Sequence, residues 1–184
     1  IRNIYGSTDM RIYKKSDNSP VTEADILSNK IISSGLMSMF EELPILSEEA
    51  EVPHYDIRKS WDYVWILDPL DGTKGFINKT DEFTINLGLA LYGIVVAGFI
   101  YAPVSQQMYF ASKGLGAYHY QKSGTHSRLT ANRFGINNPG LKVLASRHHR
   151  DARTQEHIDL LDTPVVIERG AALKFVSIAQ GEAD

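Results

Sequence analysis

The chain of 184 residues is 43% hydrophobic and 22% charged, the composition of an ordinary globular protein with enough apolar residues for a sizeable core. Its net charge of −3 and its lack of a long basic block argue against a nucleic-acid duplex as partner, although peripheral contact with a membrane stays open. Cysteine is absent, which excludes disulfides, zinc–thiolate sites and cysteine nucleophiles and fits a cytoplasmic location.

The first clear element is a helix that is expected to begin near residue 23. Thr22 is a good N-cap residue, and acidic residues that include Asp25 follow in the first turn. Apolar residues then recur at nearly helical spacing as far as Phe40, which predicts one buried stripe that ends before Pro44. Capping alone accounts for Thr22 and Asp25, so this segment by itself indicates no function.

A short apolar run, Ile45-Leu46, is followed by Ser47 and the adjacent acids Glu48 and Glu49. Adjacent carboxylates usually lie on a solvated surface. If a strand ends at Leu46, however, Glu48 can join polar groups at the end of a neighbouring strand.

The most informative stretch is a second apolar run that ends in two carboxylates. Trp61 to Leu67 is rich in aromatic and branched residues and predicts a buried strand. Asp68 follows at its carboxyl end, where α/β sheets tend to place ligand groups. Because Pro69 fixes its φ angle, we expect it to hold Asp68 and Asp71 in a stiff turn.

The residues after this turn predict a phosphate site. Gly72 and Thr73 open a helix, and the free N–H groups of a helix start favour a phosphate. Asp71-Gly72 alone is a common loop dipeptide, but acidic and hydroxyl groups at fixed offsets behind a buried strand favour a functional site. If Asp25 lies beside Thr73, it would accept a hydrogen bond from the hydroxyl that holds the attacking water.

The acidic groups together suit a hard cation. Glu48, Asp68, Asp71 and the Leu70 backbone carbonyl would form an all-oxygen site for Mg²⁺, with Mn²⁺ as an alternative. Two such ions roughly 3.5–4 Å apart can activate a water and stabilise the leaving oxygen of a phosphoryl displacement. The sequence therefore favours metal-assisted hydrolysis of a phosphate ester, with two or three ions.

The remaining chain predicts an antiparallel meander followed by a second unit. Strands are expected at 83–91, 94–101, 107–111 and 117–120. After a polar linker over 122–140, strands at 141–145 and 165–168 alternate with helices at 151–161 and 170–179. Two strands cannot bury both faces of a sheet. We therefore expect an α+β metal-binding domain over 1–138 and an incomplete α/β domain over 139–184.

Three separate motifs resemble a known family. They are Ser19-Pro-Val-Thr-Glu-Ala-Asp25, Leu46-Ser-Glu-Glu49 and Asp68-Pro-Leu-Asp-Gly-Thr73. Their order and spacing resemble the lithium-sensitive, magnesium-dependent inositol monophosphatase superfamily. Lys74, Phe76, Glu82-Phe-Thr-Ile-Asn86 and Tyr101-Ala-Pro103 are more similar to the bacterial 3′(2′),5′-bisphosphate nucleotidase branch than to inositol monophosphatase proper.

The resemblance implies a layered α/β/α/β/α sandwich of the sugar-phosphatase type, present as a monomer or homodimer. It implies a hydrolase of sulfur metabolism that removes the 3′-phosphate of a small nucleotide, adenosine 3′,5′-bisphosphate, to leave AMP. It assigns metal binding to Glu48, Asp68, the Leu70 carbonyl and Asp71, water activation to Asp25 and Thr73, and substrate binding to Gly72, Thr73, Lys74, Ser146, His149 and Lys174.

The chain departs from the pattern of this branch at three places. Gly75 stands where the branch usually has Glu, and Ala171 and Ala172 replace two serines. The family's later Trp-Asp motif, whose aspartate completes the metal site, does not occur after Ala172 in this sequence. Inositol monophosphatase activity and a non-catalytic role in binding metal or nucleotide therefore stay open as alternatives.

Overall fold

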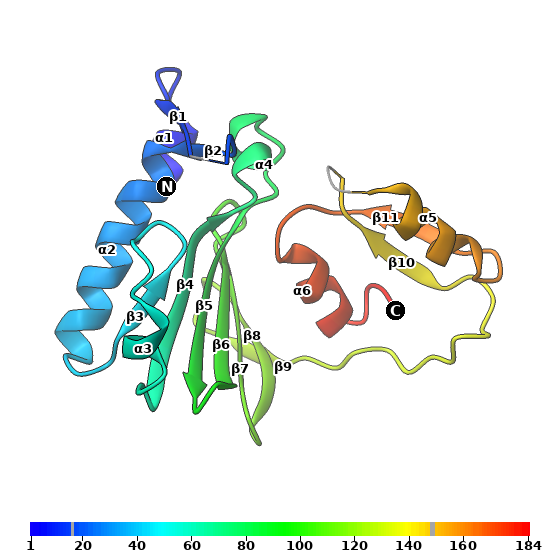
Figure 1. Ribbon diagram of the computed structural model, residues 1–184. Helices are drawn as coiled ribbons and strands as arrows, with labels where there is room; N and C mark the ends of the chain where they lie inside the picture. The colour runs from blue at the N-terminus through cyan, green and yellow to red at the C-terminus, as the bar shows by residue number, and fades with distance from the viewer. Residues whose placement is uncertain (16, 148–149) are drawn as a thin grey trace.

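A seven-stranded sheet carries most of the first two thirds of the chain, with its strands in the order β3-β4-β5-β6-β7-β8-β9 (Figure 1). The computed structural model describes residues 1–15, 17–147 and 150–184. β3 lies parallel to β4, and every later pair is antiparallel. The strands are β3 Ile45–Ser47, β4 Tyr63–Asp71, β5 Thr84–Leu91, β6 Ile94–Ala102, β7 Gln107–Ser112, β8 Gly116–Tyr120 and β9 His126–Arg128.

The meander predicted from the sequence is present, and its first hairpin shows why. β5 and β6 are joined by Tyr92 and Gly93, whose φ angles are 49° and 76°. Positive φ at both central residues is the geometry of the two-residue turn whose twist matches that of the flanking strands. The hairpin then aligns Leu91 with Ile94.

One face of the sheet is covered by α2 (Glu23–Met39) (Figure 1). The helix begins with the predicted cap, because the Thr22 hydroxyl accepts a hydrogen bond from the Ala24 N–H at 3.1 Å. The prediction of a single buried apolar stripe is wrong in part, since Ile31 and Met37 are 70% and 58% exposed. Small residues and Leu36 fill the buried face instead.

The N-terminal segment packs against the end of the sheet at which the phosphate site was predicted. It consists of α1 (Arg2–Tyr5) and the hairpin β1 (Ile12–Lys14) and β2 (Pro20–Thr22). The Tyr5 ring lies 5.1 Å from that of Phe76 and 4.7 Å from that of Phe83, centroid to centroid. Both phenylalanines are fully buried. This aromatic contact holds the short helix α4 (Thr73–Ile77) against the sheet.

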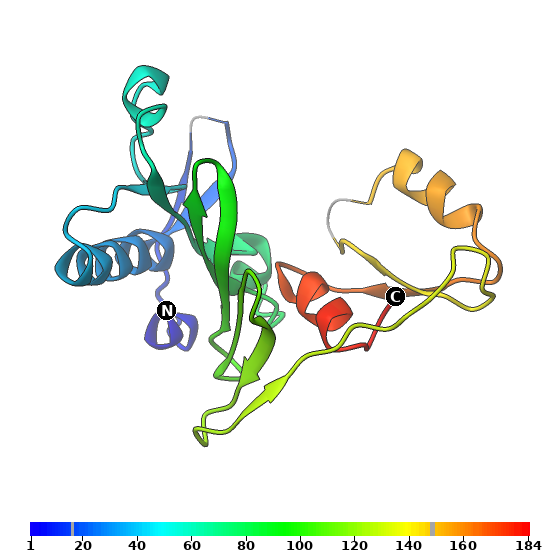
Figure 2. The ribbon, with the colours of Figure 1, turned by 90° about the horizontal axis from the view of Figure 1, so that it is seen from below.

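A second group of elements lies on the opposite side of the sheet (Figures 1 and 2). It contains β10 (Lys142–Ala145) and β11 (Val165–Glu168), which pair in parallel, with α5 (Ala152–Asp159) and α6 (Leu173–Ala179). The short helix α3 (Tyr55–Arg58) precedes β4 on the α2 side.

The layers follow in the order α2, seven-stranded sheet, α6, β10–β11 and α5 (Figure 1), which confirms the predicted layered fold. The division into domains at residue 138 stays a prediction. In the part of the chain that the structure describes, no helix combines the length and apolarity needed to cross a membrane.

Candidate functional site

Two carboxylates on β4 reach the same face of the sheet through a β-bulge. Asp68 is paired with Asn86 on β5, and Asp71 with Thr84, with a register shift between them. Three steps along β4 thus oppose two along β5. Residues three apart on a regular strand face opposite sides, so the extra residue brings both carboxylates together. The predicted stiff turn is wrong, because the strand continues through Pro69, which a bulge tolerates.

Asp68 lies in an environment that disfavours its negative charge. Burial raises the pKa of Asp68 to about 7, and the nearby charges of Asp71 and Glu48 act in the same direction. The Leu70 N–H donates to Asp68 Oδ1 at 3.1 Å, which lowers the pKa but does not compensate. Such excess negative charge favours a proton or a cation at this position.

Asp71 is oriented by a residue that the sequence did not single out as part of the site. Asn86 Nδ2 donates to Asp71 Oδ2 at 3.2 Å. The other amide atom, Asn86 Oδ1, is buried without a hydrogen-bond partner among the described residues. The sequence named Asn86 only as the last residue of a motif of the nucleotidase branch, and the strand register, which places it opposite Asp68 on β5, reveals its role.

Glu48 reaches the site from the neighbouring strand, as the sequence suggested. The Glu48 N–H donates to the carbonyl of Leu67, the residue before Asp68, at 3.1 Å, which ties Glu48 to β4. Its carboxylate faces Lys15, whose Nζ lies 2.8 Å from Glu48 Oε1 and 2.5 Å from Glu49 Oε1. Within residues 1–15, 17–147 and 150–184, no three Asp, Glu or His side chains surround a common point as a ready metal site.

Thr73 and Asp25 form the hydrogen bond that the sequence suggested. Thr73 Oγ1 donates to Asp25 Oδ1 at 3.1 Å and lies 3.4 Å from the Leu70 carbonyl oxygen. The other oxygen, Asp25 Oδ2, accepts from the Thr22 N–H at 2.8 Å. Asp25 is only 1% exposed, so it is held rigidly between the helix cap and Thr73. The capping role and the suggested contact with Thr73 are both present, and catalysis by this pair stays a prediction.

The predicted residues from distant parts of the chain line one cavity of about 460 Å³. In the first part of the chain (residues 1–138), the lining includes Glu48, Asp71, Gly72, Thr73 and Lys74. In the second part (residues 139–184), it includes Ser146 and Lys174. Gly72 has a φ of 89° and precedes α4. Lys174 Nζ donates to the Ala171 carbonyl at 2.9 Å. His149 lies outside the residues that the structure describes.

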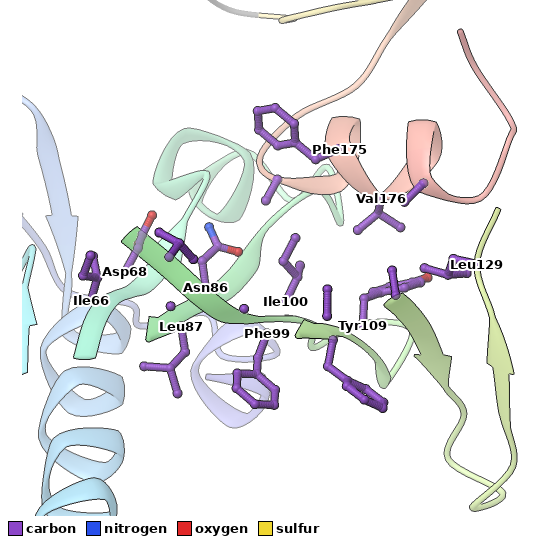
Figure 3. Close-up of a pocket in the computed structure, with 18 residues that line it drawn as sticks. Ile66, Asp68, Asn86, Leu87, Phe99, Ile100, Tyr109, Leu129, Phe175 and Val176 are labelled. Carbon is purple, nitrogen blue, oxygen red and sulfur yellow. The ribbon is translucent and has the colours of Figure 1, made fainter. Parts of the chain in front are cut away.

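A second, more apolar cavity of about 510 Å³ lies between α6 and the sheet (Figure 3). Asp68 and Asn86 lie at one end of it, and Phe175 and Val176 line it from α6. Phe175 lines both cavities. The polar groups suited to phosphate chemistry nevertheless gather around the smaller cavity, which we take as the candidate active site.

Comparison with known proteins identifies relatives of this chain. The model of the inositol monophosphatase family matches residues 1–184. The 3′(2′),5′-bisphosphate nucleotidase CysQ of Escherichia coli (strain K12) is 37% identical over 178 residues, which are 97% of this chain and 70% of the relative.

Solved structures share the fold. The crystal structure of CysQ from Bacteroides thetaiotaomicron is 32% identical, has a TM-score of 0.77, and is matched over 100% of this chain and 72% of that one. An IMPase/NADP phosphatase complexed with Mg²⁺ and phosphate has a TM-score of 0.72 over 95% of this chain and 64% of that one. At 19% identity, this second likeness concerns the fold alone.

Proposed function

Because the chain belongs to the inositol monophosphatase family, we propose that it is a metal-dependent phosphomonoesterase that converts adenosine 3′,5′-bisphosphate to AMP. The observation that carries the proposal is the cavity of about 460 Å³, in which acidic groups and the Gly72-Thr73 segment face Ser146 and Lys174. One side of the cavity suits a metal and a phosphate, and the other offers groups to the rest of a nucleotide. The similarity to CysQ nucleotidases supports this substrate class.

The donor set fits a hard divalent cation. Glu48, Asp68, Asp71 and the Leu70 carbonyl offer only oxygen atoms, which Mg²⁺ and Mn²⁺ prefer. The pKa of Asp68 is raised, mainly by burial, so its charged form is disfavoured in the absence of a cation. A bound cation would stabilise the charged carboxylate. Bound there, two or three Mg²⁺ ions would activate water and neutralise the phosphate oxygens.

Side chains and backbone groups of the chain would orient the attacking water and bind the substrate. Thr73, held by Asp25, would orient the attacking water through its hydroxyl. The backbone N–H groups of Gly72 and Thr73 would bind the phosphate that is removed. Lys74, with Lys174 across the cavity, would hold the second phosphate and the ribose.

Ser146 and His149 complete the proposed substrate contacts. The rest of the proposal is that the enzyme acts in the cytoplasm, in sulfur metabolism, as a monomer or homodimer. The lack of cysteine supports a reducing compartment.

The test measures phosphate release from adenosine 3′,5′-bisphosphate and from inositol 1-phosphate, with Mg²⁺ and with or without Li⁺. We expect release from the nucleotide to exceed release from inositol 1-phosphate and to be inhibited by Li⁺. Asp71→Asn, which removes one charge from the metal site, should abolish it, and Asp62→Asn at the exposed start of the same segment should not. Preference for inositol 1-phosphate would make the chain an inositol monophosphatase. Release from neither substrate by a folded, Mg²⁺-binding protein would support a non-catalytic role.

A further inference from the structure

Glu82 joins three parts of the candidate active site that lie far apart in the sequence. It stands in the turn between α4 and β5, next to the fully buried Phe83. Its backbone packs on the segment proposed to bind phosphate, and its side chain reaches the second part of the chain. Glu82 also lines the cavity of about 460 Å³. No role in the proposed reaction has been given to it so far.

The backbone of Glu82 lies directly over α4. A Cβ atom on Gly75 would stand 2.6 Å from the Glu82 carbonyl oxygen, and one on Gly72 would stand 2.8 Å from the same atom. Real Cβ contacts do not reach such distances, so both positions need glycine in this arrangement. The close approach gives Gly75, where the related branch usually has Glu, a structural role in this chain.

The side chain of Glu82 binds two segments of the second part. Arg147 donates from Nε to Glu82 Oε2 and from Nη2 to Oε1, both at 3.2 Å. The Gly170 N–H donates to Oε2 at 3.1 Å. Among the residues that the structure describes, Arg147–Glu82 is the ion pair that joins residues 1–138 to residues 139–184. The Glu82 side chain is only 19% exposed, which limits its screening by water.

These two segments carry the residues proposed to hold the nucleotide. Arg147 follows Ser146, and Gly170 begins the loop that leads to Lys174. The same loop touches the phosphate segment a second time, since a Cβ on Gly72 would lie 3.1 Å from the Ala171 Cβ. The position of the loop relative to Gly72 and Thr73 therefore depends on the carboxylate of Glu82.

We propose that Glu82 is a positioning residue that sets the distance between the phosphate that is removed and the rest of the nucleotide. Its side chain accepts hydrogen bonds from Arg147 and Gly170, which are not among the proposed metal ligands. It acts by fixing Arg147 and Gly170, and through them the substrate-binding segments, to the turn above α4. The inference rests on the proposed function for its kinetic consequence, but the loop position that it describes can be tested without substrate.

The kinetic test compares Glu82→Gln with the parent protein, both loaded with Mg²⁺. We expect the KM for adenosine 3′,5′-bisphosphate to rise roughly tenfold, as for the loss of a charge-assisted hydrogen bond, with kcat nearly unchanged. Kinetics with p-nitrophenyl phosphate should stay the same, because this substrate offers one phosphate and no nucleoside. Arg147→Met should raise the KM by a similar factor. Combining it with Glu82→Gln should raise the KM little beyond the value of either single variant. Glu168→Gln, which removes the 3.9 Å pair with Arg150, is the matched control.

The structural test measures amide hydrogen exchange of the same proteins without substrate. Glu82→Gln should speed exchange at residues 170–174 and leave residues 85–90 unchanged. If Glu82→Gln fails to fold by circular dichroism, Arg147→Met carries both tests. Equal losses with the two substrates, or an unchanged KM and unchanged exchange, would overturn the inference. If the parent hydrolyses neither substrate, the proposed function fails, and the exchange data still decide whether Glu82 positions the loop.

Discussion

Replacing Asp68 by Asn should stabilise the metal-free protein at pH 8 while removing its response to Mg²⁺. Burial and the charges of Asp71 and Glu48 raise the pKa of Asp68 from 3.8 to about 7. Since the folded-state pKa lies above the ordinary value, the stability linked to this proton is complete at low pH and is lost as the pH rises towards 7. Asn carries no charge at any pH, so the variant escapes that loss.

The magnitude follows from the size of the shift. The pKa of Asp68 rises by roughly three units, and about two of these fall in the range from pH 5 to pH 7. At about 1.36 kcal/mol a unit, they correspond to about 2.7 kcal/mol of unfolding free energy. Asp68 is only partly buried, and screening by solvent leaves roughly half of this, ~1.4 kcal/mol. Between pH 5 and pH 8, the parent should therefore lose about 1.4 kcal/mol of unfolding free energy that Asp68→Asn keeps.

Urea unfolding of EDTA-treated protein at pH 5 and pH 8 measures this difference. Asp62→Asn, on the exposed residue just before β4, should behave like the parent. At pH 8, Mg²⁺ at one hundred times its Kd should add about 2.7 kcal/mol to the parent and much less to Asp68→Asn. If the parent and Asp68→Asn lose stability equally between the two pH values, the charge repulsion at Asp68 is not the cause and the reasoning fails.

Three further variants test other contacts of the site. Asp25→Asn should lower kcat at least about a hundredfold at saturating Mg²⁺ because Thr73 is no longer held for the water, and full activity would contradict this. Gly75→Ala should cost about 1–3 kcal/mol in urea unfolding, since its Cβ would meet a backbone carbonyl at 2.6 Å, and parental stability would refute it. Lys15→Met should tighten Mg²⁺ binding about fivefold in calorimetry by freeing Glu48, whereas the exposed Lys14→Met should not; equal affinities would count against this competition.

Local signals in the sequence predicted much of the fold. The cap at Thr22 and the hairpin at Tyr92-Gly93 depend on interactions between residues close in the chain, and the strand before Asp68 is marked by its own run of apolar residues. The chemistry of the residues suggested a contact between Asp25 and Thr73, and the family resemblance gave both the same role; they are 48 residues apart, and the hydrogen bond between them is present.

The features that sequence reasoning missed depend on contacts between distant segments. A proline after a strand suits a turn as well as a bulge, and the register with β5 decides between them at Pro69. Glu82 was named only as the first residue of a family motif, and its contacts were missed because its partners, Arg147 and Gly170, lie 65 and 88 residues further along. No local pattern carries that information. The ion pairs of Lys15 were missed for the same reason.

Because of the bulge in β4, the faces to which Asp68 and Asp71 point depend on the number of residues between them. Deleting one residue between them would leave two steps along β4 opposite the two steps from Asn86 to Thr84, so both carboxylates would keep their face, but the bulge and one of Pro69 and Leu70 would be lost. Adding one residue would turn a carboxylate towards α2. We therefore expect the two positions between Asp68 and Asp71 to tolerate substitutions more readily than insertions or deletions. A relative with a different number of residues there should lack the proposed phosphatase activity.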